Sequence, residues 1–317
     1  MVIVLTNSED ATSDFLCEKL HQNTIRHCRL NTDSVMRECR IDYSISKASL
    51  SFGNNKICST EVRAVWLRRP KHLHHTEALS PELGHAACEW MEALEGFLAH
   101  IPENRWINHP TANARASHKI EQLTRASQNG LRVPDSLLTQ NPEAVRAFWR
   151  KYNRSLVVKP LSSGYIERQN PEDDSVIYTS GVSERSLENL DLVSQCPTLF
   201  QEQIAKESDV RVCFLDGEMV AVDLIAIDQG RQRLDIRRNN MQGVNYRVRE
   251  MPLDVQSRLT ELLQSYALRC AAVDFVIDEK GNWIFLEINP NGQWAWLDLE
   301  CDAGISELFV NKFKADA

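Results

Sequence analysis

The sequence lacks the features that mark membrane-bound and secreted proteins. No apolar run approaches the ~20 residues that a helix needs to cross a bilayer. The apolar start of the chain is short and carries no basic segment, so it predicts a first strand and not a signal peptide. The nine cysteines are odd in number and form no C-x-x-C pair, which argues against a disulfide framework and a four-cysteine zinc site. We therefore expect a protein of the reducing cytoplasm without a membrane partner.

Common phosphate-binding and nucleophile motifs are missing as well. The chain contains neither G-x-x-x-x-G-K-[ST] nor G-x-G-x-x-G, which excludes P-loop and Rossmann nucleotide sites. Ser162 and Ser163 beside Gly164 do not form a G-x-S-x-G elbow and have no identifiable histidine partner, so a serine hydrolase is not expected. The net charge of −8 does not favour a nucleic-acid partner.

What is present is an ordinary globular composition in a chain long enough for two or three structural units. The 317 residues are 43% hydrophobic and 25% charged. Alternating strand and helix patterns over residues 1–110 predict a small α/β unit with a partly parallel sheet. Within this unit, apolar spacing predicts a helix at 81–100, and strands are predicted at 63–70 and 105–110.

The rest of the chain is predicted to consist of hairpins and a few amphipathic helices. Helices are expected at 116–130, where Gly130 would supply the C′ residue, and at 253–270. Two alternating apolar runs around Asp216-Gly217 predict a hairpin. The segment "RLDIR", residues 233–237, is predicted to be a further strand.

The last predicted hairpin, residues 271–289, interrupts two apolar strands with polar side chains. A turn centred on Glu279-Lys280 would pair Asp274 with position 285. Side chains alternate between the two faces of a strand. The apolar sets that would share the core-facing side are Val273, Phe275 and Ile277 from the first strand and Ile284, Leu286 and Ile288 from the second.

The opposite face of this hairpin would gather Asp274, Glu287 and Asn289, and a register shift of two residues would keep that grouping. Two carboxylates so placed repel each other unless a cation compensates them. Oxygen-only ligands suit Mg²⁺, so Asp274 and Glu287 could hold one ion, and Glu287 and Asn289 a second. The alternative is a solvated hairpin face, and the hairpin alone does not decide between the two.

Five segments, in chain order, resemble the ATP-grasp superfamily: a helical lysine (Lys119), "VVKP" with Lys159, "FQEQIAKESDVRV", Asp274 and "FLEINPNG". The resemblance covers residues 111–309. It is nearest the branch that ligates carboxylates to amino groups in peptides, the ribosomal-protein glutamate-ligase-like enzymes. Within that branch, "VWLRRP", "VVKPLSSG", "IYTS" and "EINPNGQWAWLD" resemble the microviridin-type maturases, which form side-chain crosslinks in ribosomal peptides called graspetides.

The resemblance implies an α/β (α+β) fold in two domains. A pre-ATP-grasp α/β domain would occupy residues 1–110, where the match depends mostly on "VWLRRP". A two-lobed ATP-grasp domain, with antiparallel sheets that clamp ATP, would occupy 111–317. Its lid-bearing small lobe is expected at about 134–204 and its metal-binding lobe at 205–317.

The resemblance also implies a nucleotide site. Two lysines would reach the phosphates as point charges, a "SSGY" lid would cover them, a hinge strand would bind adenine, and an aspartate would lie near the ribose. In that order, the residues are Lys119, Lys159, Ser163, Gly164, Glu202, Gln203, Ile204 and Asp209. The alternative for each lysine is an exposed surface residue without a role in nucleotide binding.

Two arginines are implied to act on the transferred groups. Arg211 would steady the phosphoryl group and Arg237 would hold an acyl phosphate. A cross-strand ion pair between Asp209 and Arg211 is the structural alternative. Four more arginines are expected either to lie on a solvated face or to hold an acidic peptide. They are Arg231, Arg233, Arg247 and Arg249.

The implied activity is an ATP-dependent carboxylate–amine or carboxylate–hydroxyl ligase that acts on a precursor peptide with a leader segment. The cofactors would be ATP and two Mg²⁺ ions, with Mn²⁺ as a substitute. Dimers are common in the resembled family, so a homodimer is an open option. The alternatives are a ligase that adds free amino acids to a peptide terminus or joins small molecules, and a nucleotide-binding module without catalysis.

Two other groups of residues could suggest function. The histidines at 72, 74, 75 and 85 have no carboxylate or cysteine partner at fixed spacing, so we expect surface residues and not a zinc site. Trp294 and Trp296 are expected to be packing residues, with lining of an acceptor pocket as the alternative.

Overall fold

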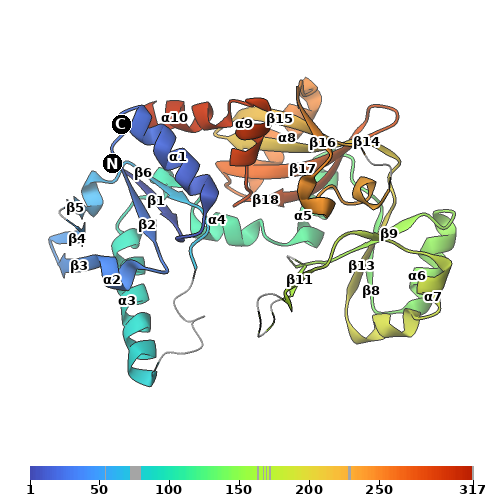
Figure 1. Cartoon of the computed structure of the whole chain (residues 1–317), viewed down its shortest axis with the longest axis horizontal. Coiled ribbons are helices and arrows are strands. Elements are labelled where there is room, and N and C mark those ends of the chain that lie inside the picture. Colours follow the sequence, from blue (N-terminus) through green and yellow to red (C-terminus); the bar gives the residue numbers. More distant parts are fainter. Residues whose placement is uncertain are drawn as a thin grey trace.

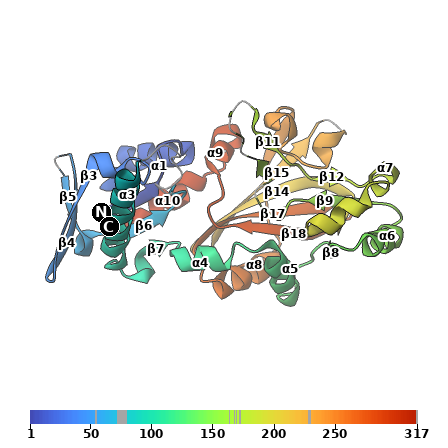
Figure 2. The ribbon, with the colours of Figure 1, turned by 90° about the horizontal axis from the view of Figure 1, so that it is seen from below.

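The computed structural model describes residues 1–53, 55–71, 80–162, 164–166, 168, 170, 173–227 and 230–315. Figure 1 shows an N-terminal unit in blue and cyan, a small lobe in green and yellow, and a central sheet in orange and red. Seen from below, the central sheet lies between the N-terminal unit and the small lobe along the molecule's long axis (Figure 2). Both chain ends lie on the N-terminal unit (Figures 1 and 2).

The N-terminal unit is built on a parallel four-stranded sheet in the order β2-β1-β6-β7. Its strands are β1 (Val2–Thr6), β2 (His27–Asn31), β6 (Ala64–Leu67) and β7 (Trp106–Ile107). Every residue of β1 is buried, as expected for a parallel strand covered on both faces. The predicted α/β unit, its partly parallel sheet and its strands near 63–70 and 105–110 are confirmed.

Several further elements complete this unit. Helices α1 (Ala11–Gln22) and α3 (Pro81–Ala99) flank the parallel sheet, and α3 confirms the helix predicted at 81–100. An antiparallel sheet that the sequence patterns did not predict lies beside them. Its strands are β3 (Cys39–Ser44), β4 (Lys47–Phe52) and β5 (Asn55–Cys58). The short helix α2 (Val35–Glu38) completes the unit, and α4 (Pro110–Arg115) follows it in the chain.

The small lobe is an antiparallel sheet in the order β12-β9-β13-β8, with helix α6 (Pro142–Lys151) packed against it. Its strands are β8 (Ser136–Thr139), β9 (Leu156–Lys159), β12 (Ser180–Gly181) and β13 (Thr198–Glu202). The Asn141 side chain accepts a hydrogen bond from Glu143 N and caps α6. The pair β10 (Tyr165–Ile166) and β11 (Ser175–Val176) extends from this lobe, and the short helix α7 (Glu184–Leu187) follows it.

The central sheet has five antiparallel strands in the order β16-β15-β14-β17-β18. They are β14 (Lys206–Leu215), β15 (Glu218–Ala226), β16 (Val244–Arg249), β17 (Cys270–Asp278) and β18 (Trp283–Asn289). Asp216 and Gly217 have positive φ and form the predicted turn between β14 and β15.

The two faces of the central sheet are covered differently. Helices α5 (Lys119–Gln128) and α8 (Leu253–Ser265) pack on one face over the main hydrophobic cluster. On the other face, helices α9 (Ala295–Cys301), α10 (Ile305–Ala315) and α1 cover one end of the strands. The remainder of that second face carries charged side chains.

Two sequence expectations need correction, and two helices were not expected. The segment 233–237 is not a strand, because 3-10 turns at Arg231–Arg233 and Arg238–Met241 surround it. The helix predicted at 253–270 ends at Ser265, and Cys270 already begins β17. Helices α9 and α10 were not predicted. Within the described part of the chain, no helix combines the length and apolar composition needed to span a bilayer.

Candidate functional site

A β-bulge in the last hairpin sets the geometry of the site. Ile277 pairs with Trp283 and Phe275 with Phe285, but the register then shifts, so Asp274 pairs with Glu287. The extra residue at Leu286 reverses the alternation in β18. Phe285 and Ile288 therefore face the main core, and the core-facing set predicted at 284, 286 and 288 is wrong except for Ile288.

The bulge brings four polar side chains together on the partly open sheet face. Arg211 is the register partner of Asp274 on β14, and Asp274 is the partner of Glu287 on β18. Asn289 Nδ2 donates to Asp274 Oδ2 at 3.0 Å and to Glu287 Oε1 at 3.2 Å. The predicted grouping of Asp274, Glu287 and Asn289 is thus present in the structure, in the register shifted by two residues.

Each carboxylate of this group lies beside a cation. Arg211 Nε is 3.0 Å from Asp274 Oδ1, and Lys119 Nζ is 3.2 Å from Glu287 Oε2. The two carboxylate side chains retain 23% and 28% of their exposure, so a ligand can reach them. A face that mixes carboxylates, an amide and cations is suited to binding metal and phosphate together.

The ionisation of the two carboxylates is unequal. Burial raises the pKa of Asp274 to about 7, with Arg211 opposing the shift and Glu287 adding to it. Burial acts in the same direction on Glu287, but Lys119 and Asn289 outweigh it and hold the pKa of Glu287 below its usual range. The donor set, two carboxylates and an amide that can turn its oxygen outward, fits a divalent cation that prefers oxygen ligands.

The two predicted phosphate-binding lysines come from different elements. Lys119 begins α5, and its Nζ donates to the carbonyl oxygens of Pro160 at 3.0 Å and Ser162 at 3.4 Å. Lys159 ends β9, and burial lowers its pKa to about 8 although Glu287 favours the charged form. The surface-lysine alternative is wrong for both, because Lys119 is bonded into the site and Lys159 is half-buried.

Two glycines allow the backbone to pass close to other groups. Gly164 has φ of +72°, and a Cβ there would lie 2.7 Å from Ile177 O. A Cβ at Gly292 would lie 2.2 Å from the Cβ of Ala272. Side chains at either position would therefore displace the segment around β10 and β11 or the loop after β18. Ser163, the other predicted lid residue, lies outside the described residues.

The predicted hinge joins the small lobe to the central sheet. Glu202 Oε1 accepts a hydrogen bond from Asp135 N at 2.9 Å, and Gln203 N donates to Ser155 O at 3.0 Å. The backbone N–H of Ile204 makes no hydrogen bond to another residue of the described ranges. Among the described residues, this N–H is therefore left without a partner in the segment that joins the two lobes.

Asp209 is held by a lysine that the sequence patterns did not single out. Lys206 Nζ donates to both carboxylate oxygens of Asp209 at 2.6 Å. Because Arg211 pairs with Asp274, the alternative of an Asp209–Arg211 ion pair is wrong. Asp209 and Lys206 line a cavity of 330 Å³ together with Leu224 and other residues of β14 and β15.

Arg237 is tied to the segment that follows the lid strands. Its guanidinium binds Asp235 through two hydrogen bonds of 2.9 and 2.6 Å, and Asp235 also accepts from Thr179 N at 2.9 Å. Burial acts to raise the pKa of Asp235, but these bonds, led by Arg237, bring it to about 2. Arg237 and Arg238 lie 5.7 and 4.9 Å from the ring centre of Tyr178.

Other arginines of the sheet have structural partners. Arg247 and Arg249 both bind Asp223, a fully buried carboxylate on β15. Arg233 donates to Lys206 O at 2.8 Å. A buried carboxylate such as that of Asp223 needs cationic partners, so a structural role accounts for its contacts with Arg247 and Arg249.

The histidine cluster was expected to lie on the surface, and the tryptophans were expected to be packing residues. Histidines 72, 74 and 75 lie outside the described residues, and His85 is exposed on α3. No group of three His, Cys, Asp or Glu suited to a metal occurs within the described ranges. Trp294 is buried and stacks on Phe309 at 4.9 Å, and Trp296 packs against Tyr246, so the packing role is confirmed.

The sequence patterns missed the N-terminal residues that reach the loop after β18. Arg68 Nη1 donates to Asn291 O, and Asn113 Nδ2 donates to Asn291 Oδ1 at 3.0 Å. The sequence feature that could have identified Arg68 is "VWLRRP", in which two arginines directly follow β6, a strand that is buried throughout.

Comparisons with known proteins agree with this arrangement. Residues 1–114 match the family model described as the MvdD pre-ATP grasp domain. The macrocyclase MdnC from Microcystis aeruginosa MRC, bound with precursor peptide MdnA, has a similar structure (TM-score 0.83, 26% identity, 99% of each chain covered). No curated protein matches the sequence.

Two further solved structures are similar. One is a Chryseobacterium gregarium RiPP-associated ATP-grasp ligase in complex with ADP and a leader and core peptide (TM-score 0.86, 25% identity, 100% of this chain and 97% of that chain). The other, ATP-grasp ligase PsnB, was solved with a phosphomimetic variant of its minimal precursor, Mg and ADP (TM-score 0.77, 20% identity, 99% and 98% covered). At this lower identity, PsnB shows a shared fold.

Proposed function

Because the chain is an ATP-grasp ligase of the graspetide type with an MvdD-type pre-ATP-grasp domain, we propose that it crosslinks a ribosomally made precursor peptide. It would activate Asp or Glu side-chain carboxylates of the peptide as acyl phosphates and join them to hydroxyls or amines. The observation that carries the proposal is the match to MdnC over 99% of both chains, which includes both the N-terminal unit and the charged sheet face.

The metal and nucleotide sites are part of the proposal. Asp274, Glu287 and Asn289 would hold Mg²⁺, two ions with Glu287 shared between them, and Mn²⁺ could take their place. The metal would supply charge neutralisation on the nucleotide phosphates. Their oxygen donors and partial exposure support this assignment, as does the presence of Mg and ADP with the similar ligase PsnB.

The remaining site residues would act on the phosphates and the substrate. Lys119 and Lys159 would contact the phosphates, and the Ile204 N–H would bind adenine together with the adjoining hinge residues. Asp209 would lie near the ribose, and Gly164 would let the lid approach the phosphates. The positions of these residues around one face of the central sheet and the adjoining hinge support the assignment.

In the proposed reaction, a peptide carboxylate attacks the γ-phosphorus of ATP, which forms an acyl phosphate and releases ADP. A hydroxyl or amine of the peptide then attacks the acyl carbon, loses its proton, and expels phosphate. Arg211 and Arg237 would hold the negative charge of the acyl phosphate while the lid keeps water away. The absence of a protein nucleophile from this chemistry agrees with a site made of cations, carboxylates and an amide.

The proposal is tested by co-expression with each short open reading frame of the gene neighbourhood that encodes an acidic, Thr- or Ser-rich peptide. The expected result is a peptide lighter by one water per crosslink, with fragmentation that places each crosslink between an Asp or Glu and a hydroxyl or amine side chain. A peptide that gains the mass of a free amino acid would instead support the alternative ligase. Unchanged peptide masses, together with no ADP release, would contradict both ligase functions.

We also propose that residues 1–110 form the pre-ATP-grasp domain and residues 111–317 the ATP-grasp domain, with lobes at about 134–204 and 205–317. The separate sheets of these segments and the family match over residues 1–114 support this division. A homodimer and a cytoplasmic location stay predictions.

A further inference from the structure

The loop that follows the site strand β18 is held by the N-terminal unit. Residues 289–292 form a turn in which Gly292 N donates to Asn289 O at 3.0 Å. Asn291 lies inside this turn, and its carbonyl oxygen accepts a hydrogen bond from Arg68 Nη1. Arg69 Nε lies 3.4 Å from the same oxygen. The position of the turn therefore depends on side chains more than 200 residues earlier in the sequence.

Arg68 carries a charge that is buried and therefore loses its solvation by water. Its side chain is 1% exposed, and so is that of its partner Asp10, whose Oδ2 is 3.4 Å from Arg68 Nε. Asp10 also accepts hydrogen bonds from Thr6 and Ser13 at 2.8 and 2.6 Å. Burial lowers the pKa of Arg68 to about 10, although Asp10 opposes this effect.

This buried pair is poorly arranged for stability alone. Arg68 Nη2 and Asp10 Oδ1 are buried without a hydrogen-bond partner within the described part of the chain. A buried ion pair with unsatisfied atoms contributes little net stability compared with an apolar pair of the same size. What Arg68 supplies beyond charge compensation is a donor aimed across the domain boundary at the Asn291 carbonyl.

Both ends of the turn at residues 289–292 contact residues of the site. Asn289, its first residue, bridges Asp274 and Glu287. At its other end, a Cβ on Gly292 would lie 3.3 Å from Arg211 Nη1, so this backbone lies directly against the arginine of the site. A shift of the turn would therefore move the amide of Asn289 and the guanidinium of Arg211 together.

The chain after the turn is anchored in the same N-terminal unit. Trp294 is buried between Trp66 and Phe309, with ring centroids 6.3 and 4.9 Å away. Arg68 lies 5.9 Å from the ring of Trp66. The segment between Asn289 and Trp294 thus has fixed ends, and Arg68 holds its middle.

We infer that Arg68 is a positioning residue that couples the N-terminal domain to the divalent-cation site by fixing the turn that carries Asn289. The inference rests on the proposed function to the extent that Asn289 belongs to the Mg²⁺–nucleotide site. Residues that orient a metal ligand commonly change metal affinity by about 10- to 100-fold when they are replaced. The N-terminal domain would accordingly control nucleotide binding without touching the nucleotide.

The test compares the variants Arg68→Lys and Arg269→Lys in the full chain. Lysine at 68 keeps a positive charge beside Asp10 but lacks the fork that reaches Asn291. Arg269 is the matched control, because it also joins the two domains, through contacts with Asp216, Asn104 O and Trp106 O that lie outside the turn. Calorimetric titration with Mg²⁺ and ADP measures affinity, and hydrogen exchange of residues 289–294 without ligand measures the freedom of the turn.

The expected result for Arg68→Lys is at least ~10-fold weaker binding of Mg·ADP and faster exchange at 289–294. Arg269→Lys is expected to keep wild-type values of both. Wild-type affinity in a folded Arg68→Lys protein, or equal losses in the two variants, would overturn the inference and leave the proposed function standing. If the wild-type chain shows no affinity for Mg·ADP, the proposed function is overturned and the inference falls with it.

A second variant covers the case in which Arg68→Lys does not fold. The double variant Asp10→Asn, Arg68→Met removes both buried charges together, so neither is left uncompensated, and it also removes the donor to Asn291 O. It is expected to weaken Mg·ADP binding by at least ~10-fold. Unchanged affinity and unchanged exchange at 289–294 in the folded double variant would overturn the inference.

Discussion

The two faces of the central sheet use the same strands for opposite purposes. On the helix-covered face, Phe275 and Phe285 are buried and meet edge to face, with ring centroids 5.7 Å apart. On the other face, Asp274 and Glu287 stay partly exposed and lie beside cations. Neighbours in the chain therefore differ in what they contribute: one face holds the sheet together, and the other is available for chemistry.

Among the variants that test this division between the two faces, Glu287→Ala on the charged face is expected to have the largest effect, which is on the reaction rate. Loss of one electrostatic contact costs on the order of 10²–10³ in rate, and Glu287 would serve both metals, so a loss of more than ~10³-fold is expected. ADP release in the presence of a precursor peptide measures it. Because the side chain is not part of the core, the unfolding midpoint should change little.

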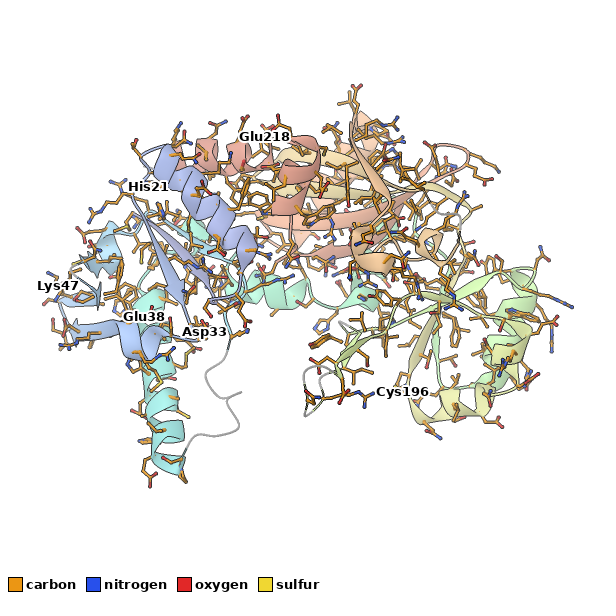
Figure 3. All side chains as sticks on the ribbon, viewed as in Figure 1. His21, Asp33, Glu38, Lys47, Cys196 and Glu218 are labelled. Carbon is orange, nitrogen blue, oxygen red and sulfur yellow. The ribbon has the colours of Figure 1, made fainter. Side chains whose placement is uncertain are left out.

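A matched control for this variant is Glu218→Ala. Glu218 is an exposed glutamate at the start of β15, at the upper edge of the molecule in Figure 3. Its replacement should leave turnover unchanged. Near-normal turnover in Glu287→Ala would contradict the role assigned to the charged face.

The opposite face is tested by Phe285→Ala. Removing a fully buried phenylalanine should lower the free energy of unfolding by ~3–5 kcal/mol, because the lost ring leaves a cavity. Urea denaturation measures this change, and Leu192→Ala, at an exposed position, serves as the control. If Phe285→Ala abolished Mg·ADP binding while stability stayed at the wild-type value, the division between the two faces would be wrong.

A smaller effect on stability is expected from Asp235→Asn. The folded pKa of Asp235 is about 2, below the ~3.9 of an unfolded aspartate, so its ionised form stabilises the fold above about pH 4. That contribution is lost as the pH falls through 2. At pH 7 we expect a loss of about 1–2 kcal/mol, because half-exposed Arg237 is screened by solvent.

Denaturation of wild type and Asp235→Asn at several pH values measures this effect. The stability difference between the two proteins should shrink as the pH falls below about 4. A difference that stays constant over the whole acid range would show that ionisation of Asp235 is not its source.

The smallest expected effect is a change in pH dependence at Lys159. Burial lowers its pKa to about 8, so without ligand it loses its charge as the pH rises through 8. Only the charged amine attracts phosphate, and ADP affinity should fall several-fold between about pH 7 and 9. Lys159→Arg keeps its charge throughout this range and should show a shallower fall, measured by calorimetry. Parallel curves for the two proteins would exclude Lys159 as the titrating group.

Local sequence patterns predicted much of the fold because local forces produce it. The apolar spacing of 81–100 is that of α3, and Asn141, an asparagine directly before Pro142, caps α6. The turn at Asp216-Gly217 needs positive φ, which these residues adopt readily. Residues 233–237 alternate like a strand but lie between tight turns, where Asp235 binds Arg237 and the Thr179 backbone.

The site also combines features that the sequence predicted with features that it did not predict. Alternation predicted that Asp274, Glu287 and Asn289 share one face, and the structure brings them together only because the bulge at Leu286 shifts the register of β18. The bulge at Leu286 could not be predicted, because one extra residue in a strand leaves no periodic signal. The lysine partner of Asp209 also went unpredicted, since Lys206 lies beside a register shift in β14.

The sequence by itself determined which side chains share a face of a strand without a bulge, such as β17, because alternation there is a property of the local backbone. Only the tertiary structure decided that Lys119 meets Glu287 and that Arg68 meets Asn291. Such partners, far apart in the chain, meet only when whole domains pack together, and no pattern within a short window records that packing.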